Sequence, residues 1–140
     1  MKKIKFLLDK LGRDKGPELF EANNSVLKYH VLKDNDEFLD AVTQKIVEEL
    51  EEVFESDSKE NLIEELADLE EVLTTFKKLV GITQDQVDKV RTEKREKKGG
   101  FEKRIYCEYV TVEEGSKDHE YFLNDPEKYP EIKKELGMED

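Results

Sequence analysis

The distribution of hydrophobic residues predicts two long amphipathic helices in the middle of the chain. Apolar side chains recur at intervals of three and four residues from Asp36 to about Glu55, and the pattern repeats up to Val80. We expect Asp36 to cap the first helix, while Asp57 and Glu60 resemble a capping box for the second. Because the link between them is short, the two helices should pair as an antiparallel hairpin.

Weaker patterns surround this hairpin. Pro17–Ala22 is predicted as a short helix, and Gly81 is placed to end the second long helix. A third helix should begin after Thr83, with Gln86 completing a capping box, and run to Lys98.

The remaining segments lead to an all-α prediction with an appended tail. Phe101–Val112 contains several β-formers and is predicted as a short strand or extended arm, and Glu131–Leu136 as a short terminal helix. We therefore expect an all-α helical domain over residues 1–112, followed by a polar tail over residues 113–140.

Charge is concentrated in one stretch of the chain. The 140 residues include 36 acidic and 24 basic ones, for a net charge of −12. The segment from Asp36 to Glu71 carries a net charge of −13, whereas Lys89 to Arg104 carries +5. The acidity argues against nucleic acid or an anionic membrane as a partner, although a free polyphosphate could still bind at a cation held by the acidic segment.

The direction of the acidic side chains predicts a metal site. At 100° per residue, Glu49 and Glu65 fall inside the apolar stripes of the two long helices, with Glu52 and Asp68 at the stripe edges. An ionised carboxylate is costly to bury unless it is paired or bound to a cation. Carboxylate oxygens suit Mg²⁺, with Mn²⁺ as the alternative. Surface acids or arginine-paired core acids are the other interpretations. The acidic side chains predicted to point away from the apolar stripes are those of Glu48, Glu51, Glu64 and Glu71.

The same residues resemble a known family. Glu48–Glu52 and Glu64–Asp68 resemble the Glu-x-x-Glu and Glu-x-x-Asp motifs of the MazG-like nucleotide pyrophosphohydrolases. Leu11–Glu18 resembles the Leu-Val-Arg-Asp-Lys-Ile-Pro-Glu opening of the phosphoribosyl-ATP pyrophosphohydrolase-like subgroup, with glycine at two positions that are usually aliphatic. Lys94–Glu102 resembles the basic Gly-Gly-Phe close of that subgroup. The resemblance covers about residues 1–110.

This resemblance implies a fold and an activity. The family is all-α and completes a four-helix bundle by dimerising, in some members forming tetramers. Its members use Mg²⁺ to cleave a nucleoside triphosphate between the α and β phosphates, which gives a monophosphate and pyrophosphate. The positions that match the family's metal ligands are Glu49, Glu52, Glu65 and Asp68, and Glu48 matches an acid adjoining them.

Phosphate chemistry adds candidate catalytic and binding residues. Glu48 or Glu49 is a candidate to accept the proton of the attacking water. Cations should stabilise the leaving polyphosphate, although cations at the end of a helix also interact favourably with the helix dipole. The candidates for phosphate binding are Lys94, Arg95 and Lys98, with Arg13 and Lys15 as a second set.

Three other functions fit the sequence. Phosphoribosyl-ATP hydrolysis would be the same chemistry on another substrate. A non-catalytic helical module could bind metal or nucleotide, and a helical hairpin could bind a basic protein partner. Cys107 is the single cysteine, and the apolar run near Met1 is too short for a signal peptide, so we expect a cytoplasmic protein.

Overall fold

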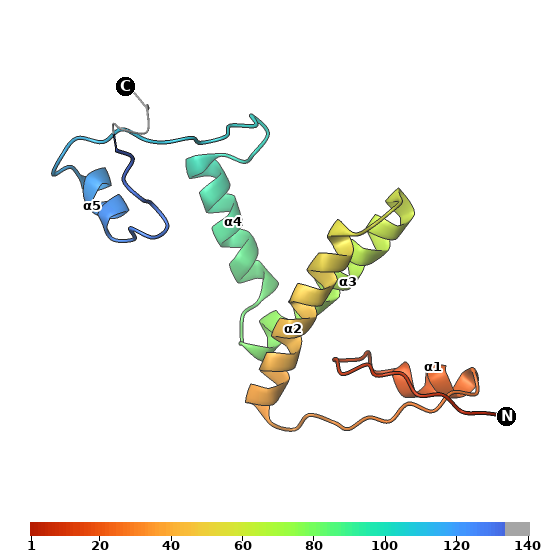
Figure 1. Cartoon of the computed structure of the whole chain (residues 1–140). Helices are drawn as coiled ribbons and strands as arrows, with labels where there is room; N and C mark the ends of the chain where they lie inside the picture. The colour runs from red at the N-terminus through yellow and green to blue at the C-terminus, as the bar shows by residue number, and fades with distance from the viewer. Residues whose placement is uncertain (134–140) are drawn as a thin grey trace. The chain divides into compact units, whose positions relative to one another are not determined.

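The computed structural model describes residues 1–133 and confirms the all-α prediction, since these residues form helices and no strand. The chain divides into two compact units, Met1–Lys98 and Gly99–Asp140. Within residues 1–133, four helices belong to the first unit and one to the second (Figure 1). In order they are α1 Gly16–Ala22, α2 Asn35–Phe54, α3 Lys59–Leu79, α4 Gln84–Lys98 and α5 Lys117–Leu123.

The predicted hairpin is formed by α2 and α3, which lie side by side (Figure 1). The prediction that Asp36 caps α2 is wrong by two residues. Asp34 accepts hydrogen bonds from the backbone amides of Asp36 and Glu37, at 2.8 and 3.4 Å, so Asp36 is already inside the helix.

The cap of α3 also differs from the prediction. Ser58, rather than Asp57, accepts the hydrogen bond from the backbone amide of Asn61, at 3.0 Å. The end of α3 is as expected. Gly81 has φ +75°, and the amide of Ile82 returns to the carbonyl of Lys77 at 2.9 Å, which closes the helix as a Schellman motif.

The capping box predicted for α4 is confirmed. The amide of Gln86 donates to Thr83 Oγ1 at 3.2 Å, and the amide of Thr83 donates to Gln86 Oε1 at 2.9 Å. The helix ends at Lys98, and Gly99 follows with φ +84°, a backbone conformation that side-chain-bearing residues rarely adopt.

The hairpin has a thin hydrophobic core. Val42 is the fully buried hydrophobic residue of the described chain, with no exposed surface. Several apolar side chains of the hairpin remain exposed, namely Val47, Phe54, Ile63 and Leu66. A single chain therefore leaves part of the apolar stripes of α2 and α3 in contact with water.

The second unit differs most from the prediction. Of the two alternatives predicted for Phe101–Val112, the strand is wrong, since no described segment offers it a ladder partner. After a turn at Phe101 the segment forms neither helix nor strand, so the extended-arm alternative is not contradicted. Helix α5 was not predicted. Its N-cap residue is Ser116, whose hydroxyl accepts a hydrogen bond from the amide of His119 at 3.2 Å. The expected helix Glu131–Leu136 has no helical residue over 131–133, and its remainder lies outside the described residues.

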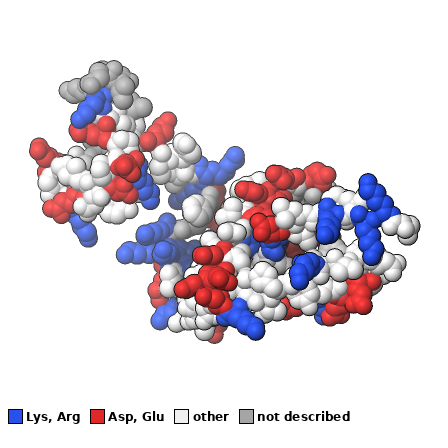
Figure 2. All heavy atoms as spheres, turned by 60° about the horizontal axis from the view of Figure 1, so that its bottom comes forward, with Lys and Arg blue, Asp and Glu red and all other residues white. Residues whose placement is uncertain are grey.

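Acidic and basic side chains are interspersed over the face of the molecule that Figure 2 shows. The net charge of −12 therefore does not produce one uniformly acidic face in this view. No helix within residues 1–133 combines the length and the apolar character needed to cross a membrane.

Candidate metal centre

Four carboxylates from the two hairpin helices converge at one place. Glu49 and Glu52 come from α2, and Glu65 and Asp68 come from α3. One carboxylate oxygen from each residue lies within 4.8 Å of the corresponding oxygens of the other three. The structure thus brings together all four residues that the sequence analysis selected as metal ligands. Two Glu/Asp pairs with a spacing of three residues achieve this because i and i+3 share a helix face.

Burial separates these four residues from ordinary surface acids. Glu49 is only 5% exposed, and the other three side chains are half-buried. Among the described residues, Glu49 Oε2 and Glu65 Oε2 are buried oxygens without a hydrogen-bond partner. An unpartnered buried carboxylate oxygen is costly, and a cation held between the two helices would satisfy both oxygens. The oxygen-only donor set fits a hard divalent cation.

The outward face of the hairpin is also largely as predicted. Glu51, Glu64 and Glu71 are exposed. The exception is Glu48, whose side chain is 27% exposed and accepts hydrogen bonds from Lys10 at 3.0 Å and Lys45 at 3.2 Å. Glu48 is therefore not the solvated surface acid that an outward direction predicts, because Lys10 of the N-terminal segment and Lys45 of α2 contact it.

The two adjacent glutamates have opposite electrostatic environments. Burial, followed by the hydrogen bond and charge of Glu52, raises the pKa of Glu49 above its ordinary value, and Lys45 only partly offsets this. Burial acts in the same direction on Glu48, but the hydrogen bonds and charges of Lys10 and Lys45 outweigh it and lower the pKa of Glu48. Glu49 therefore holds a proton more readily than Glu48 does.

Two cations contact the carboxylate cluster, and a third contacts the neighbouring Glu48. Arg13 Nη2 lies 2.6 Å from Asp68 Oδ1, and Lys45 Nζ lies 3.3 Å from Glu49 Oε1. Lys10 pairs with Glu48, as described above. The sequence analysis selected Arg13 but missed the two lysines. The spacing of Lys45 from Glu48 and Glu49, three and four residues, was the available signal for one of them. No local pattern indicated Lys10.

The other predicted phosphate-binding cations are exposed. Lys15 is the N-cap residue of α1, and Lys94, Arg95 and Lys98 lie on the last turns of α4. Since α4 turns away from the hairpin after Gly81 (Figure 1), the phosphate-binding role of these residues stays a prediction.

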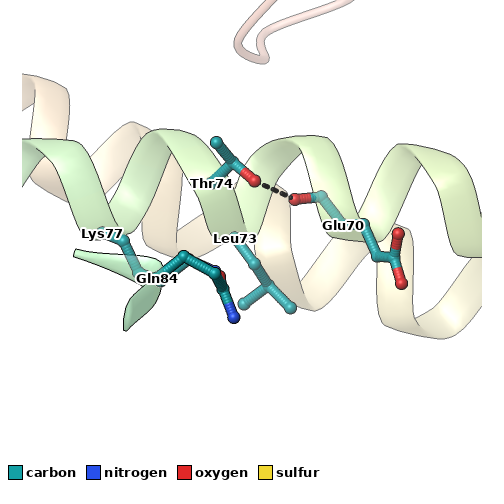
Figure 3. Close-up of a pocket in the computed structure, with 5 residues that line it drawn as sticks. All are labelled: Glu70, Leu73, Thr74, Lys77 and Gln84. Carbon is teal, nitrogen blue, oxygen red and sulfur yellow. Dashed lines mark hydrogen bonds between the residues drawn. The ribbon is translucent and has the colours of Figure 1, made fainter. Parts of the chain in front are cut away.

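Two hollows on the first unit lie beside α4 rather than at the carboxylates. One, of about 300 Å³, is lined by Glu70, Leu73, Thr74, Lys77 and Gln84 (Figure 3). In it, Lys77 donates a hydrogen bond to Gln84, and Thr74 Oγ1 donates to the backbone oxygen of Glu70 at 2.9 Å. The other, of about 480 Å³, runs along α4 and includes Ile82, Val90 and Lys94. Neither hollow contains a group of acids like that on the hairpin.

Comparison of the chain with known protein families, with curated proteins and with solved structures finds no match.

Proposed function

We propose that this protein is a Mg²⁺-dependent nucleotide pyrophosphohydrolase, which cleaves a nucleoside triphosphate between its α and β phosphates. The supporting observation is the convergence of Glu49, Glu52, Glu65 and Asp68, with buried and unpartnered oxygens on two of them. The motif resemblance described above supports the reaction class. The products would be a nucleoside monophosphate and pyrophosphate, consistent with a role in controlling the nucleotide pool.

The residues that would hold the cation are the four converging carboxylates, and Mn²⁺ could replace Mg²⁺ there. When bound, such a cation neutralises phosphate oxygens and lowers the pKa of a coordinated water. Helices α2 and α3 contribute two ligands each, so the hairpin fixes the ligand spacing before any substrate arrives.

Glu48 and Glu49 both stay candidate proton acceptors for the attacking water. Glu49 lies within the carboxylate cluster, where a bound cation would engage its side chain. Glu48 lies beside the cluster in the sequence and pairs with Lys10 at 3.0 Å and Lys45 at 3.2 Å. The carboxylate that is not fully used as a ligand would accept the proton.

Cations would stabilise the negative charge that develops on the leaving phosphate groups. Arg13 is already at the cluster through its contact with Asp68, and Lys15 lies two residues further along the chain. Lys94, Arg95 and Lys98 would require a change in the position of α4 or a second copy of the chain.

We also propose a homodimer, or a homotetramer built from dimers. The exposed apolar side chains of the hairpin, such as Phe54 at 77% and Ile63 at 57%, support this proposal because pairing two hairpins would bury them. A cytoplasmic location is part of the same proposal, and the exposed free thiol of Cys107 supports it because such a thiol suits a reducing compartment.

The test is a panel of nucleoside triphosphates, with modified bases included, assayed for pyrophosphate release with and without Mg²⁺. Glu49→Gln and Glu65→Gln should each reduce the rate of pyrophosphate release by at least about a hundredfold. Even residues that only hydrogen-bond to metal ligands contribute about ten- to a hundredfold to metal affinity or activity. Glu64→Gln is the matched control, because Glu64 is exposed and adjacent to Glu65. Release that is independent of Mg²⁺, or unchanged in both site variants, would refute the proposal.

A further inference from the structure

One short segment of the N-terminal region reaches both helices of the hairpin. We call residues Lys10–Arg13 the strap. Lys10 at its start pairs with Glu48 of α2 at 3.0 Å, and Arg13 at its end pairs with Asp68 of α3 at 2.6 Å. These pairs join residues 38 and 55 positions apart in the sequence. The strap therefore places one cation on each of the two helices that carry the carboxylate cluster.

The two contacts differ in their relation to the cluster. Asp68 is one of the four converging carboxylates, whereas Glu48 is the neighbour of Glu49 and is not one of them. Arg13 thus engages a proposed metal ligand directly, and Lys10 holds the other end of the strap at the edge of the site. Both side chains are substantially exposed, Arg13 at 66% and Lys10 at 45%. Their ion pairs can therefore break without exposing buried hydrophobic residues.

We propose that the strap is a resident counter-ion that competes with the divalent cation for the carboxylate cluster. The cluster concentrates negative charge, and Arg13 compensates part of it at Asp68. A divalent cation bound to the same carboxylates repels the guanidinium, because like charges a few ångströms apart disfavour each other. Metal loading therefore weakens the Arg13–Asp68 contact and releases Arg13.

This release couples metal binding to substrate binding. Once it leaves Asp68, Arg13 is a cation at the edge of the metal site, and its planar guanidinium suits the oxygens of a phosphate group. Arg13 would then replace its contact with the Asp68 carboxylate by a contact with a phosphate group of the substrate. This regulation rests on the metal site of the proposed function, but it does not depend on turnover.

The test measures metal binding rather than activity. Isothermal titration calorimetry with Mn²⁺ compares the wild-type chain with Arg13→Gln, Arg13→Lys and the control Arg91→Gln, which removes an exposed cation that pairs with Asp88. Arg13→Gln should bind Mn²⁺ about fivefold more tightly, which is the size expected for an exposed ion pair of about 1 kcal/mol. Arg13→Lys and Arg91→Gln should bind as the wild type does.

A second measurement follows the strap itself. The side-chain Nε–Hε NMR signal of Arg13 should shift on addition of Mg²⁺, and the corresponding signal of Arg91 should not. Unchanged or weaker Mn²⁺ binding by Arg13→Gln would overturn the proposal. An Arg13 signal that does not shift on addition of Mg²⁺ would overturn it as well. Absence of Mn²⁺ binding by the wild type would overturn both the metal site and the strap. Metal binding without pyrophosphate release would contradict only the proposed reaction.

Discussion

Replacing Glu49 with glutamine should stabilise the protein when no divalent cation is present. The four carboxylate oxygens lie within 4.8 Å of one another. Two unit charges at that distance repel by about 3.5 kcal/mol at an effective dielectric constant of about 20. The Lys45 Nζ contact at 3.3 Å offsets part of this repulsion, and the raised pKa of Glu49, caused by burial and by Glu52, shows that its charged form is disfavoured. We therefore expect Glu49→Gln to raise the free energy of unfolding by about 1–2 kcal/mol.

The assay is urea unfolding followed by circular dichroism, in buffer with a chelator and in buffer with Mg²⁺, at one fixed protein concentration. A cation at about 100 times its dissociation constant should stabilise the wild type by about 2.7 kcal/mol. Glu49→Gln should lose most of this gain. The variant should therefore be more stable than the wild type in chelator and less stable than the wild type in Mg²⁺. Glu51→Gln, an exposed change on the same helix, should show neither effect. The reasoning is refuted if Glu49→Gln destabilises the chelated protein, or if Mg²⁺ stabilises both proteins equally.

Two further predictions concern stability alone. Because lysine contacts lower the pKa of Glu48, the stability that Glu48 contributes should be present above the ordinary carboxyl pKa and lost as pH falls through its lower folded value. The difference in unfolding free energy between wild type and Glu48→Gln, about 1 kcal/mol at neutral pH, should therefore vanish in acid; a difference that persists there would contradict the assigned cause. Val42→Ala should cost about 2 kcal/mol in urea unfolding, because it opens space at the fully buried position. Val47→Ala, at a position that is 52% exposed, should cost less than about 0.5 kcal/mol, and an equal loss in both variants would contradict the assignment of the core.

The sequence alone predicted the parts of this protein that depend on local periodicity. The apolar spacing located the hairpin helices, and Thr83 with Gln86 predicted the capping box of α4. The direction of Glu49 and Glu65 was also readable, because a helix turns by a fixed 100° per residue. Two residues on each of two paired helices were thus enough to predict that four carboxylates meet.

Other local features were ambiguous because neighbouring residues can serve the same role. Asp34 and Asp36 can both cap a helix, as can Asp57 and Ser58, and the backbone geometry at each start decides between them. The short helix α5 has too few turns to show a clear apolar period, so its Ser116 cap was not recognised.

Only the tertiary structure decided the electrostatics of the candidate site. Lys10 and Arg13 reach Glu48 and Asp68 across 38 and 55 positions of the chain, and no periodicity encodes such contacts. These contacts give Glu48 a lowered pKa, while Glu49 beside it is buried and has a raised one. The sequence could state which carboxylates face inward because that follows from helix geometry. Which of them are paired, and with which cations, depends on how a segment without regular structure folds back over the hairpin.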